Sequence, residues 1–240
     1  GKKLDRFGLL VGLASGFING LTLAAIFSAL ETVSASITSL MGLALIQIFT
    51  LLLLALGGEK LTLQKGIRLV VGLFGLYLLV GLGGEADPLG LLLILVGAAL
   101  FAIHLVSVQW YLRPYSTWTV TTLIVVAGTL PVIGLWLFGG ANTFVPLPIG
   151  LIAILLQGFI TTFIGRILTY QAINIIGSAQ YALLNPLEAA LTVLWAALFL
   201  GERLTGSQWL GTLFIFLSLL LASDLIWRFF RHKVANIGQR

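Results

Sequence analysis

Polar side chains that could bind a solute lie inside long apolar stretches of this sequence. Four of them are spaced by four, three and four residues, so on a helix they share one stripe: Tyr181, Asn185, Glu188 and Thr192. Tyrosine and asparagine offer hydrogen bonds, and a buried carboxylate such as Glu188 can meet an amine or carry a proton. The alternative is that Asn185 and Glu188 only hydrogen-bond neighbouring helices.

Arg166 and His104 are further candidates for solute binding within the apolar stretches. Arg166 stays charged at any relevant pH, so it needs an anion, carbonyl groups or water. It could snorkel to the nearby membrane surface. Alternatively, since we expect the Asn185–Glu188 segment at similar depth, Arg166 could pair with that segment or clasp a substrate carboxylate together with it. His104 could relay protons or only hydrogen-bond a neighbouring helix. Asn19 is expected to line a cavity.

These residues must be positioned by a membrane protein. The 240-residue chain is 59% hydrophobic and 9% charged, whereas soluble proteins carry roughly 25% charged residues. Its absence of cysteine excludes disulfides and thiol chemistry, and with only two histidines a zinc site is not expected. We find no phosphate-binding glycine loop and no defensible nucleophile–base pair, so neither a cofactor nor an enzyme activity is predicted. An intramembrane enzyme would have only His104 with Glu188 as its acid–base set.

The expected fold is an all-α polytopic membrane protein with eight transmembrane helices. Each apolar run is about 20–26 residues long, enough to cross roughly 30 Å of hydrocarbon at 1.5 Å per residue. The predicted spans are 8–29, 33–57, 64–83, 88–111, 117–138, 148–173, 177–200 and 206–228.

The basic residues predict how these spans are oriented. The net charge is +5, but the lysines and arginines lie in short loops and at the termini beside apolar runs, so they indicate topology rather than nucleic-acid binding. With eight spans, eleven of the thirteen basic residues fall on the side that holds both termini. The other side has only Arg203, and Arg166 lies within a span. Both termini are therefore predicted to be cytoplasmic, with the chain in the cytoplasmic (inner) membrane.

A duplication is visible at a spacing of 143 residues. Glu59-Lys60-Leu61-Thr62 corresponds without a gap to Glu202-Arg203-Leu204-Thr205, and Gly58 corresponds to Gly201. The two turns are predicted on opposite sides of the membrane, so the copies are inverted. Inverted repeats are typical of secondary transporters, which bind substrate near the midplane between the repeats. Chance similarity of two apolar hairpins is the alternative, and the turns themselves are expected to cap hairpins and fix register.

Two local patterns bear on helix packing. Gly8, Gly12, Gly16 and Gly20 give one helix a smooth face for close packing, or alternatively for sliding during transport. Pro186 has no N–H, so it is predicted to kink the helix over 177–200 and free a carbonyl beside the polar stripe.

Residues 172–222 closely resemble the second half of an EamA-like domain of the drug/metabolite transporter superfamily. The residues that carry the resemblance are Ala172, Gly177-Ser178-Ala179, Asn185-Pro186-Leu187-Glu188, Gly201-Glu202-Arg203-Leu204 and Gly211. A similar series occurs in residues 27–83: Ser28-Ala29-Leu30, Ser34-Ala35-Ser36, Gly58-Glu59-Lys60-Leu61, Gly72 and Gly75.

Two departures from the family pattern affect what is expected. Members typically have ten helices in two inverted five-helix repeats, whereas residues 1–83 supply three helices and residues 84–240 a complete set of five. The first two helices are missing, so we expect a fragment or, alternatively, an eight-helix protein. In addition, Gly42-Leu43 stands in the first repeat where Asn185-Pro186 stands in the second.

The resemblance implies a secondary transporter, an exporter or exchanger of small metabolites such as amino acids or amphipathic solutes. Substrate contacts are then expected from Arg166 and Glu188, with hydrogen bonds from Tyr181, Asn185 and His104. Expected partners are the solute, the lipid bilayer, a coupling proton and a second copy of the chain in a homodimer, with no nucleic acid. The alternative function is a half-transporter that acts as an assembly subunit of a membrane complex.

Overall fold

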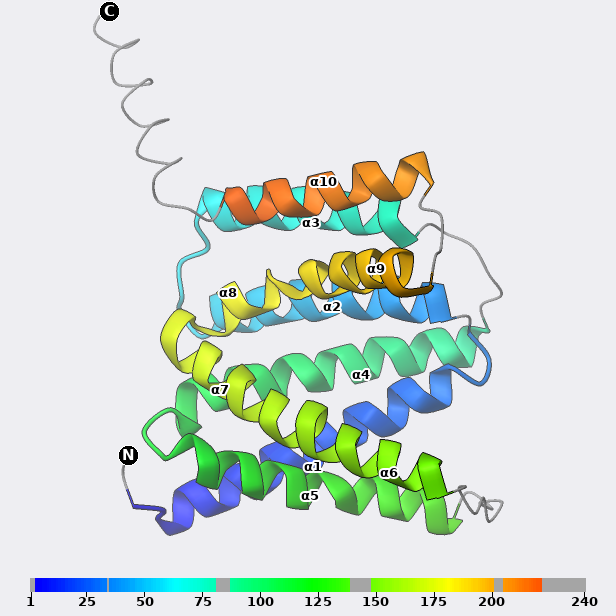
Figure 1. The fold of residues 1–240 in the computed structure, drawn as a ribbon. Coiled ribbons are helices and arrows are strands. Elements are labelled where there is room, and N and C mark those ends of the chain that lie inside the picture. Colours follow the sequence, from blue (N-terminus) through cyan, green and yellow to red (C-terminus); the bar gives the residue numbers. More distant parts are fainter. Residues whose placement is uncertain (1–2, 34, 81–86, 139–147, 201–204, 222–240) are drawn as a thin grey trace, which may run out of the picture.

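The computed structural model describes residues 3–33, 35–80, 87–138, 148–200 and 205–221, and these segments are almost entirely helical (Figure 1). The α-helices are α1 Arg6–Ala29, α2 Ala35–Leu56, α3 Leu63–Val80, α4 Pro88–Ser107, α5 Thr117–Phe138, α6 Pro148–Leu156, α7 Gly165–Ile176, α8 Ser178–Ala182, α9 Asn185–Leu200 and α10 Gly206–Leu220. Two π-helical segments are continuous with neighbouring α-helices. Segment η1, Val108–Leu112, follows α4, and segment η2, Gln157–Ile164, connects α6 to α7.

The all-α fold is confirmed, and the chain is a multi-pass membrane protein. Within the described segments, four helical stretches are long and apolar enough to cross a bilayer: Arg6–Ala29, Pro88–Leu112, Thr117–Leu137 and Gly150–Ile176. The last of these joins α6, η2 and α7 into one helical stretch, as the predicted span over 148–173 requires. A further apolar helix over Met41–Leu56 is shorter. The predicted Glu202-Arg203 turn and the end of the last predicted span lie outside the described residues.

Helix ends follow local sequence signals. Asp5 accepts a hydrogen bond from the Gly8 N–H at 2.8 Å and begins α1, and Asp87 followed by Pro88 begins α4 in the same way. At the end of α2, Gly58 has φ +88°, and the N–H groups of Gly58 and Glu59 bond to the carbonyls of Ala55 and Leu54. This arrangement of an αL glycine and two reversed hydrogen bonds satisfies carbonyl groups that a helix end leaves open.

The glycine face of α1 packs directly against α5. A methyl group on Gly16 would lie 2.7 Å from the carbonyl oxygen of Ile124, and one on Gly20 would overlap the carbonyl oxygen of Gly128. Gly8 and Gly12 meet Tyr115 and Leu123, so the contacts advance along both helices together and α1 and α5 run parallel. The packing interpretation of the glycine spacing is confirmed. Two helix backbones can come this close only where one helix presents a face without Cβ atoms.

A second parallel pair and an antiparallel pair complete the arrangement (Figure 1). Met41 and Leu45 of α2 pack beside Ile94 of α4, and further along both helices Leu51 and Leu54 pack beside Val106. Helices α3 and α10 run in opposite directions, since Gly75 meets Gly211 and Ile215 while Gly72, nearer the start of α3, meets Ser218. Helix α2 lies between these groups and contacts α3, α4 and α8.

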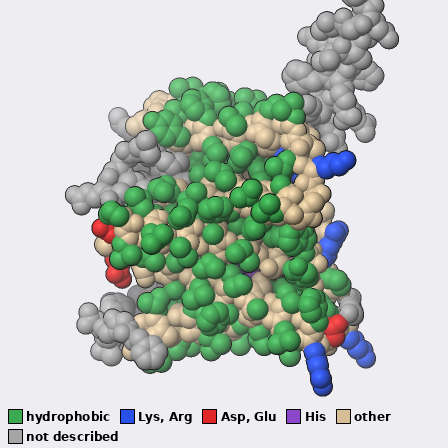
Figure 2. All heavy atoms as spheres, turned by 180° about the vertical axis from the view of Figure 1, so that it is seen from behind, with side chains coloured by type: hydrophobic (Ala, Val, Ile, Leu, Met, Phe, Trp, Pro, Cys, Tyr) green, Lys and Arg blue, Asp and Glu red, His purple; other side chains and the backbone are tan. Residues whose placement is uncertain are grey.

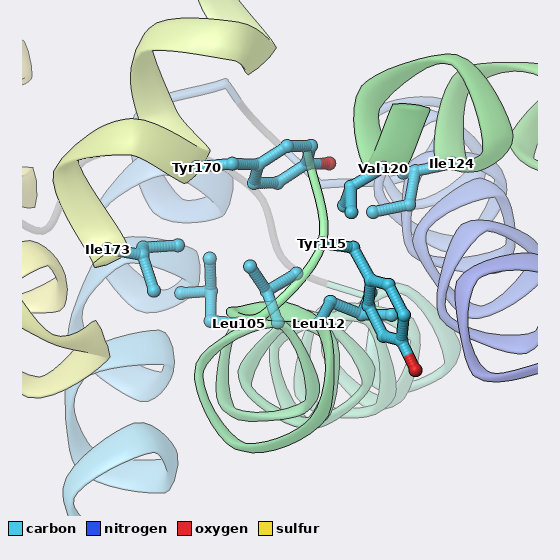
Figure 3. Close-up of a cluster of buried hydrophobic side chains, with 8 residues drawn as sticks. Leu105, Leu112, Tyr115, Val120, Ile124, Tyr170 and Ile173 are labelled. Carbon is cyan, nitrogen blue, oxygen red and sulfur yellow. The ribbon is translucent and has the colours of Figure 1, made fainter. Parts of the chain in front are cut away.

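Among the described residues, the largest buried apolar cluster joins η1 to its neighbours. Figure 3 shows Tyr170 and Ile173 of α7 facing the same interior space as Leu105, Leu112 and Tyr115, with Val120 and Ile124 of α5 beside them. These side chains are at most 5% exposed. The cluster fixes α7 against the α1–α4–α5 group and thereby fixes the position of residues that follow α7.

The single kinked helix predicted over 177–200 is wrong. The chain instead forms α8, a turn at Leu183-Leu184, and then α9. In the turn, the Leu184 N–H bonds to the Tyr181 carbonyl and the Leu187 N–H to the Leu184 carbonyl, both at 2.9 Å. Pro186 falls on the second residue of α9, where a missing N–H leaves no intrahelical bond unmade, so the proline restarts a helix instead of bending one.

The break is not shared by the corresponding segment of the first repeat. Helix α2 begins at Ala35 and α8 at Ser178, and α3 begins at Leu63 and α10 at Gly206; each pair of starts is 143 residues apart. Helix α2 nevertheless continues without interruption through Gly42-Leu43. Replacement of Asn-Pro by Gly-Leu at that position leaves every backbone donor in place, which accounts for the difference.

Charged side chains are concentrated at the ends of the helices. Figure 2 shows Lys and Arg side chains along one edge of an otherwise largely apolar face. Basic residues occur at the start of α1, at the α2–α3 turn and after η1: Lys3, Arg6, Lys60, Lys65 and Arg113. The contacts of Tyr115 with Asp5 and of Gln109 with Glu59 bring these three regions to the same end of the bundle.

Candidate solute-binding site

The break between α8 and α9 brings polar groups to helix ends inside the bundle. Asn185 begins α9 and is 8% exposed, while Glu188 lies in the first turn of α9 and is exposed from the protein. Glu188 is therefore the fourth residue of its helix and not the twelfth, as an unbroken helix over 177–200 would have made it. A carboxylate in a first turn is stabilised by the partial positive charge of the helix N-terminus.

Helix α8 is held at its start by Gln109 of η1. The Gln109 Oε1 atom accepts hydrogen bonds from the Ser178 N–H at 2.5 Å and from the Ser178 hydroxyl at 2.7 Å. The Gln109 amide nitrogen donates to Glu59 Oε1 at 2.6 Å. One amide thus joins the α2–α3 turn to the start of α8, beside Gly177 with its φ of +81°. The Glu59 side chain thus bonds outside its own hairpin, whereas its predicted role was to cap the hairpin and fix its register.

Tyr181 lies on α8 next to the break and faces α7. Its hydroxyl is 3.4 Å from the Thr169 hydroxyl, and its ring packs against the buried cluster that contains Tyr170. The side chain is half-buried. Because α8 and α9 are separate helices, Tyr181 does not continue the regular stripe predicted with Asn185 and Glu188. The side chain of Thr192, the fourth member of the predicted stripe, lies outside the part of the chain that the structure describes.

Arg166 stands at the junction of η2 and α7 and is half-buried. Its guanidinium carbon lies 5.6 Å from the centre of the Phe101 ring, a cation–π contact with α4. An aromatic face at this distance stabilises the charge without neutralising it. A π-helical segment immediately before Arg166 is a further local irregularity, and such segments recur at functional sites.

His104 is fully buried between three helices. Its Nδ1 atom lies 2.8 Å from the Ser15 hydroxyl and 3.2 Å from the Ser15 carbonyl oxygen on α1, and its Nε2 atom lies 3.2 Å from the Tyr170 hydroxyl on α7. The Phe101 ring lies beside it, with ring centres 5.7 Å apart. Both ring nitrogens therefore have partners within the protein, as the interpretation of His104 as a helix-linking residue requires.

Asn19 lies in the α1–α5 interface, away from the break. It is 5% exposed, its Oδ1 atom has no hydrogen-bond partner among the described residues, and its amide nitrogen lies close to Gly128. Gln47 and Thr50 on α2 are also fully buried with side-chain oxygen or nitrogen atoms unpaired within the described part of the chain. These three polar side chains lie on the inner faces of α1 and α2.

The structure therefore brings only part of the predicted set together. Arg166, Phe101, His104 and Tyr170 form one group at α4 and α7, and Tyr181 adjoins it through Thr169. Asn185 and Glu188 lie beyond the break at the start of α9. Within the residues that the structure describes, no cluster of three His, Cys, Asp or Glu side chains could hold a metal ion.

One buried arginine was not among the site residues predicted from the sequence. Arg68 of α3 is 3% exposed, and its guanidinium donates to the Gln180 Oε1 atom and, at 3.3 Å, to the Ser218 carbonyl oxygen. It had been counted only among the basic residues that set the topology. Its place five residues inside a predicted span was a signal available in the sequence.

The arrangement places groups that are complementary to charge near the helix break. Half-helices that meet inside a membrane expose carbonyl groups at one end and N–H groups at the other, and these ends bind ions and polar groups in transporters. Here Asn185 and Glu188 lie at the N-terminal end of α9, and two arginines, Arg68 and Arg166, lie on the elements that flank α8. Carboxylates, amines and amides would all find complementary groups.

Comparisons with known proteins agree with this fold. A solved structure described as "Crystal structure of protein" is similar to the chain at a TM-score of 0.71, with 17% sequence identity over 95% of this chain and 90% of that chain. At this identity the likeness shows the fold alone. No curated protein matches the sequence.

The second half of the chain matches a family profile. The profile is that of the EamA-like transporter family, and it covers residues 88–224. This range extends from the first residue of α4 through the broken helix and α10, and it is more than half of the chain. The chain belongs to the EamA-like transporter family, and it is a membrane transporter of the drug/metabolite transporter type.

Proposed function

We propose that this transporter is a secondary carrier that exports or exchanges small organic solutes, such as amino acids or other amphipathic metabolites, by alternating access. The observation that carries the proposal is the break between α8 and α9. An interrupted helix with a buried Asn185 at its restart is an arrangement that transporters use at their substrate sites. The apolar surroundings favour solutes that combine a polar group with an apolar body.

Arg166 and Glu188 would meet the charged groups of the solute. Arg166 is preorganised by the Phe101 ring and is half-buried, so an approaching carboxylate could form two parallel hydrogen bonds with it. Glu188 is exposed at the start of α9 and would bind an ammonium group. Arg166 would suit a solute carboxylate and Glu188 a solute amine, and amino acids, which carry both groups, head the proposed class.

The remaining residues of the proposed site would supply hydrogen bonds or hold others in place. Tyr181 and Asn185 lie on either side of the break and would bond to polar groups of the solute. His104 would act through Tyr170, because both of its ring nitrogens are engaged within the protein. Asn19 would line a path along α1, and any coupling would be to a proton or to the solute gradient.

The basic edge supports an orientation with both termini in the cytoplasm of a cell whose inner membrane holds the protein. Lys3, Lys60 and Arg113 lie at the end of the bundle where α1 and α3 start, as the Tyr115–Asp5 and Gln109–Glu59 contacts place them. The pairing of parallel and antiparallel helices fits chain segments that cross the membrane in alternate directions. We keep residues 1–83 and 84–240 as a partial and a complete repeat, supported by the helix starts 143 residues apart.

A second candidate function is that of an assembly subunit, a half-transporter that needs a partner or a second copy of itself. One observation favours it: none of the η2 residues is buried, whereas the corresponding part of α1 packs against α4 and α5. Crosslinking in the native membrane tests this candidate. Capture of another membrane protein or a second copy at η2 in stoichiometric amounts supports the subunit, and an uncrosslinked chain that transports contradicts it.

Solute counterflow in proteoliposomes tests the carrier. Vesicles that contain the purified chain are loaded with one unlabelled amino acid and placed in a trace of the same amino acid carrying a radiolabel. A carrier accumulates label transiently because exchange runs faster than net flow. Accumulation with at least one amino acid supports the proposal, and the absence of exchange for every amino acid and matched amine and amide contradicts it.

A further inference from the structure

Arg68 is a buried cation for which the described residues supply no opposite charge. Its side chain lies in the second turn of α3 and is 3% exposed. Both of its described acceptors are neutral, the Gln180 side-chain oxygen and the Ser218 carbonyl oxygen. No carboxylate of the described residues pairs with it. A buried charge is costly unless it is paired, so this guanidinium is an unusual feature.

Capping of α10 accounts for only part of these contacts. Ser218 is near the C-terminal end of α10, where a positive charge is favourable, and Gln64 of α3 also donates to the Leu221 carbonyl at 2.9 Å. A cap needs one donor, whereas a guanidinium carries five N–H groups. The bond to Gln180 on α8 serves no helix end, and the other N–H groups have no acceptor among the described residues.

The surroundings of Arg68 lead to the helix break. One turn further along α3, the position of a Cβ on Gly72 lies 3.5 Å from the Ser218 hydroxyl and 3.6 Å from the ring of Pro186. Gln180 lies on α8 three residues before the turn at Leu183. The guanidinium thus stands where α3, α8, α10 and the start of α9 converge.

We propose that Arg68 is a second anion subsite, which binds the carboxylate of a solute at the basic end of the bundle. The inference rests on the proposed carrier function and assigns that carrier a preference for carboxylate-bearing solutes. A carboxylate would replace the neutral Gln180 oxygen with two charge-assisted hydrogen bonds, which are about twice as strong as neutral ones. Gln180 is itself partly exposed, so a solute that reaches it would compete with its side-chain oxygen for the guanidinium.

Displacement of Gln180 also has a structural consequence. The Arg68–Gln180 contact ties α3, and with it the packed helix α10, to α8. Binding of a carboxylate at Arg68 breaks this tie, so occupancy of the subsite frees α8 to move relative to α3 and α10. A neutral analogue of the same shape lacks the charge to compete and leaves the tie in place.

Four variants test the subsite in the full chain purified in detergent. The probes are 3-phenylpropanoate and its neutral amide, 3-phenylpropanamide, with binding measured by calorimetry. Gln180→Ala exposes the guanidinium and should tighten carboxylate binding several-fold. Gln180→Glu supplies an internal carboxylate and should weaken it by about tenfold or more. Arg68→Gln should abolish it, and Lys65→Gln, which removes a nearby positive charge on the same helix, should leave it unchanged.

The outcomes separate this inference from the carrier proposal. Equal binding of the amide and the carboxylate, or binding that Gln180→Glu and Arg68→Gln leave unaltered, overturns the subsite. So does a wild-type chain that binds no carboxylate, or one that binds inorganic phosphate in its place. If the chain binds the carboxylate through Arg68 but shows no counterflow, the subsite proposal stands and the carrier proposal is rejected. Because Gln180→Glu adds a stabilising pair, it stays informative even where Arg68→Gln does not fold.

Discussion

At the scale of single residues, the proposed site contains two arginines whose described partners are neutral. Arg166 rests on an aromatic ring, and Arg68 bonds to an amide and a carbonyl. Partners of this kind keep a guanidinium in place without neutralising it, so a solute carboxylate still gains a full ion pair. Two residues in the same bundle share this property, and they lie on the two elements that flank α8.

Arg166→Ala is expected to weaken binding of carboxylate solutes by about tenfold or more, because a charge-assisted pair is lost, while expression stays at the wild-type level. Arg166→Lys keeps the charge and the contact with the Phe101 ring but loses the planar guanidinium. Its affinity for the carboxylate should therefore lie between those of the wild type and Arg166→Ala. Calorimetric titration with 3-phenylpropanoate measures the change. Unaltered affinity in Arg166→Ala removes this residue from the site.

Tyr170→Phe is expected to lower stability, because the His104 Nε2 atom then loses its partner at 3.2 Å in a fully buried place. An unsatisfied buried polar atom costs about 1–3 kcal/mol, which corresponds to an unfolding temperature lower by several degrees. The matched control is Tyr77→Phe, whose ring is 45% exposed. Thermal unfolding of both variants in detergent checks this, and equal temperatures would refute the role assigned to His104.

At the scale of elements, most helices could be predicted from the sequence, whereas the break between α8 and α9 could not. The helices over 88–112 and 117–138 agree with their predicted bounds within one residue, because length and apolar composition determine a membrane helix almost alone. The break at Leu183-Leu184 could not be read, since prolines in membrane helices more often bend than end them. The structure places Pro186 beside Gly72 of α3, a contact between distant parts of the chain that the local sequence does not reveal.

The close packing of α1 on α5 predicts a strong dependence on its glycines. Gly16→Ala places a methyl group 2.7 Å from the Ile124 carbonyl oxygen, so the two backbones must separate, at a cost of about 1–3 kcal/mol. Gly134→Ala in α5 is the matched control, because nothing lies within 4 Å of that position. The unfolding temperature should fall for Gly16→Ala only, and a similar fall for both would contradict the packing described.

Replacing the break with the sequence of the first repeat tests its importance. In the double variant Asn185→Gly and Pro186→Leu, the missing N–H is restored, and α8 and α9 are expected to join as the uninterrupted α2 does. Amide hydrogen exchange at residues 183–188 should slow, and counterflow should fall by an order of magnitude or more while the protein stays folded. If amide exchange at residues 183–188 is faster or unaltered, α8 and α9 have not joined and that prediction is wrong. If the helices join and counterflow is unaltered, the break is not needed for transport.

At the scale of the whole molecule, the two repeats resemble each other in helix placement and differ in chemistry. Helix α2 is continuous where its counterpart is broken, and Leu23 stands where Arg166 stands in the second repeat. The candidate site is thus built mainly from the second repeat and completed by Arg68 of the first. This division could not be predicted, because the sequence showed the spacing of the repeats but not that α3 and α10 pack side by side.

Accessibility of the break from each side of the membrane tests the central claim most directly. The chain has no cysteine, so Leu184→Cys in the turn can be labelled by a membrane-impermeant thiol reagent added inside or outside vesicles. Lys60→Cys and Glu31→Cys mark the two opposite ends and should each react from one side only. Alternating access predicts that Leu184→Cys reacts from both sides, with the balance shifted by the solute that supports counterflow. Reaction from one side alone, whatever the solute, would contradict the account.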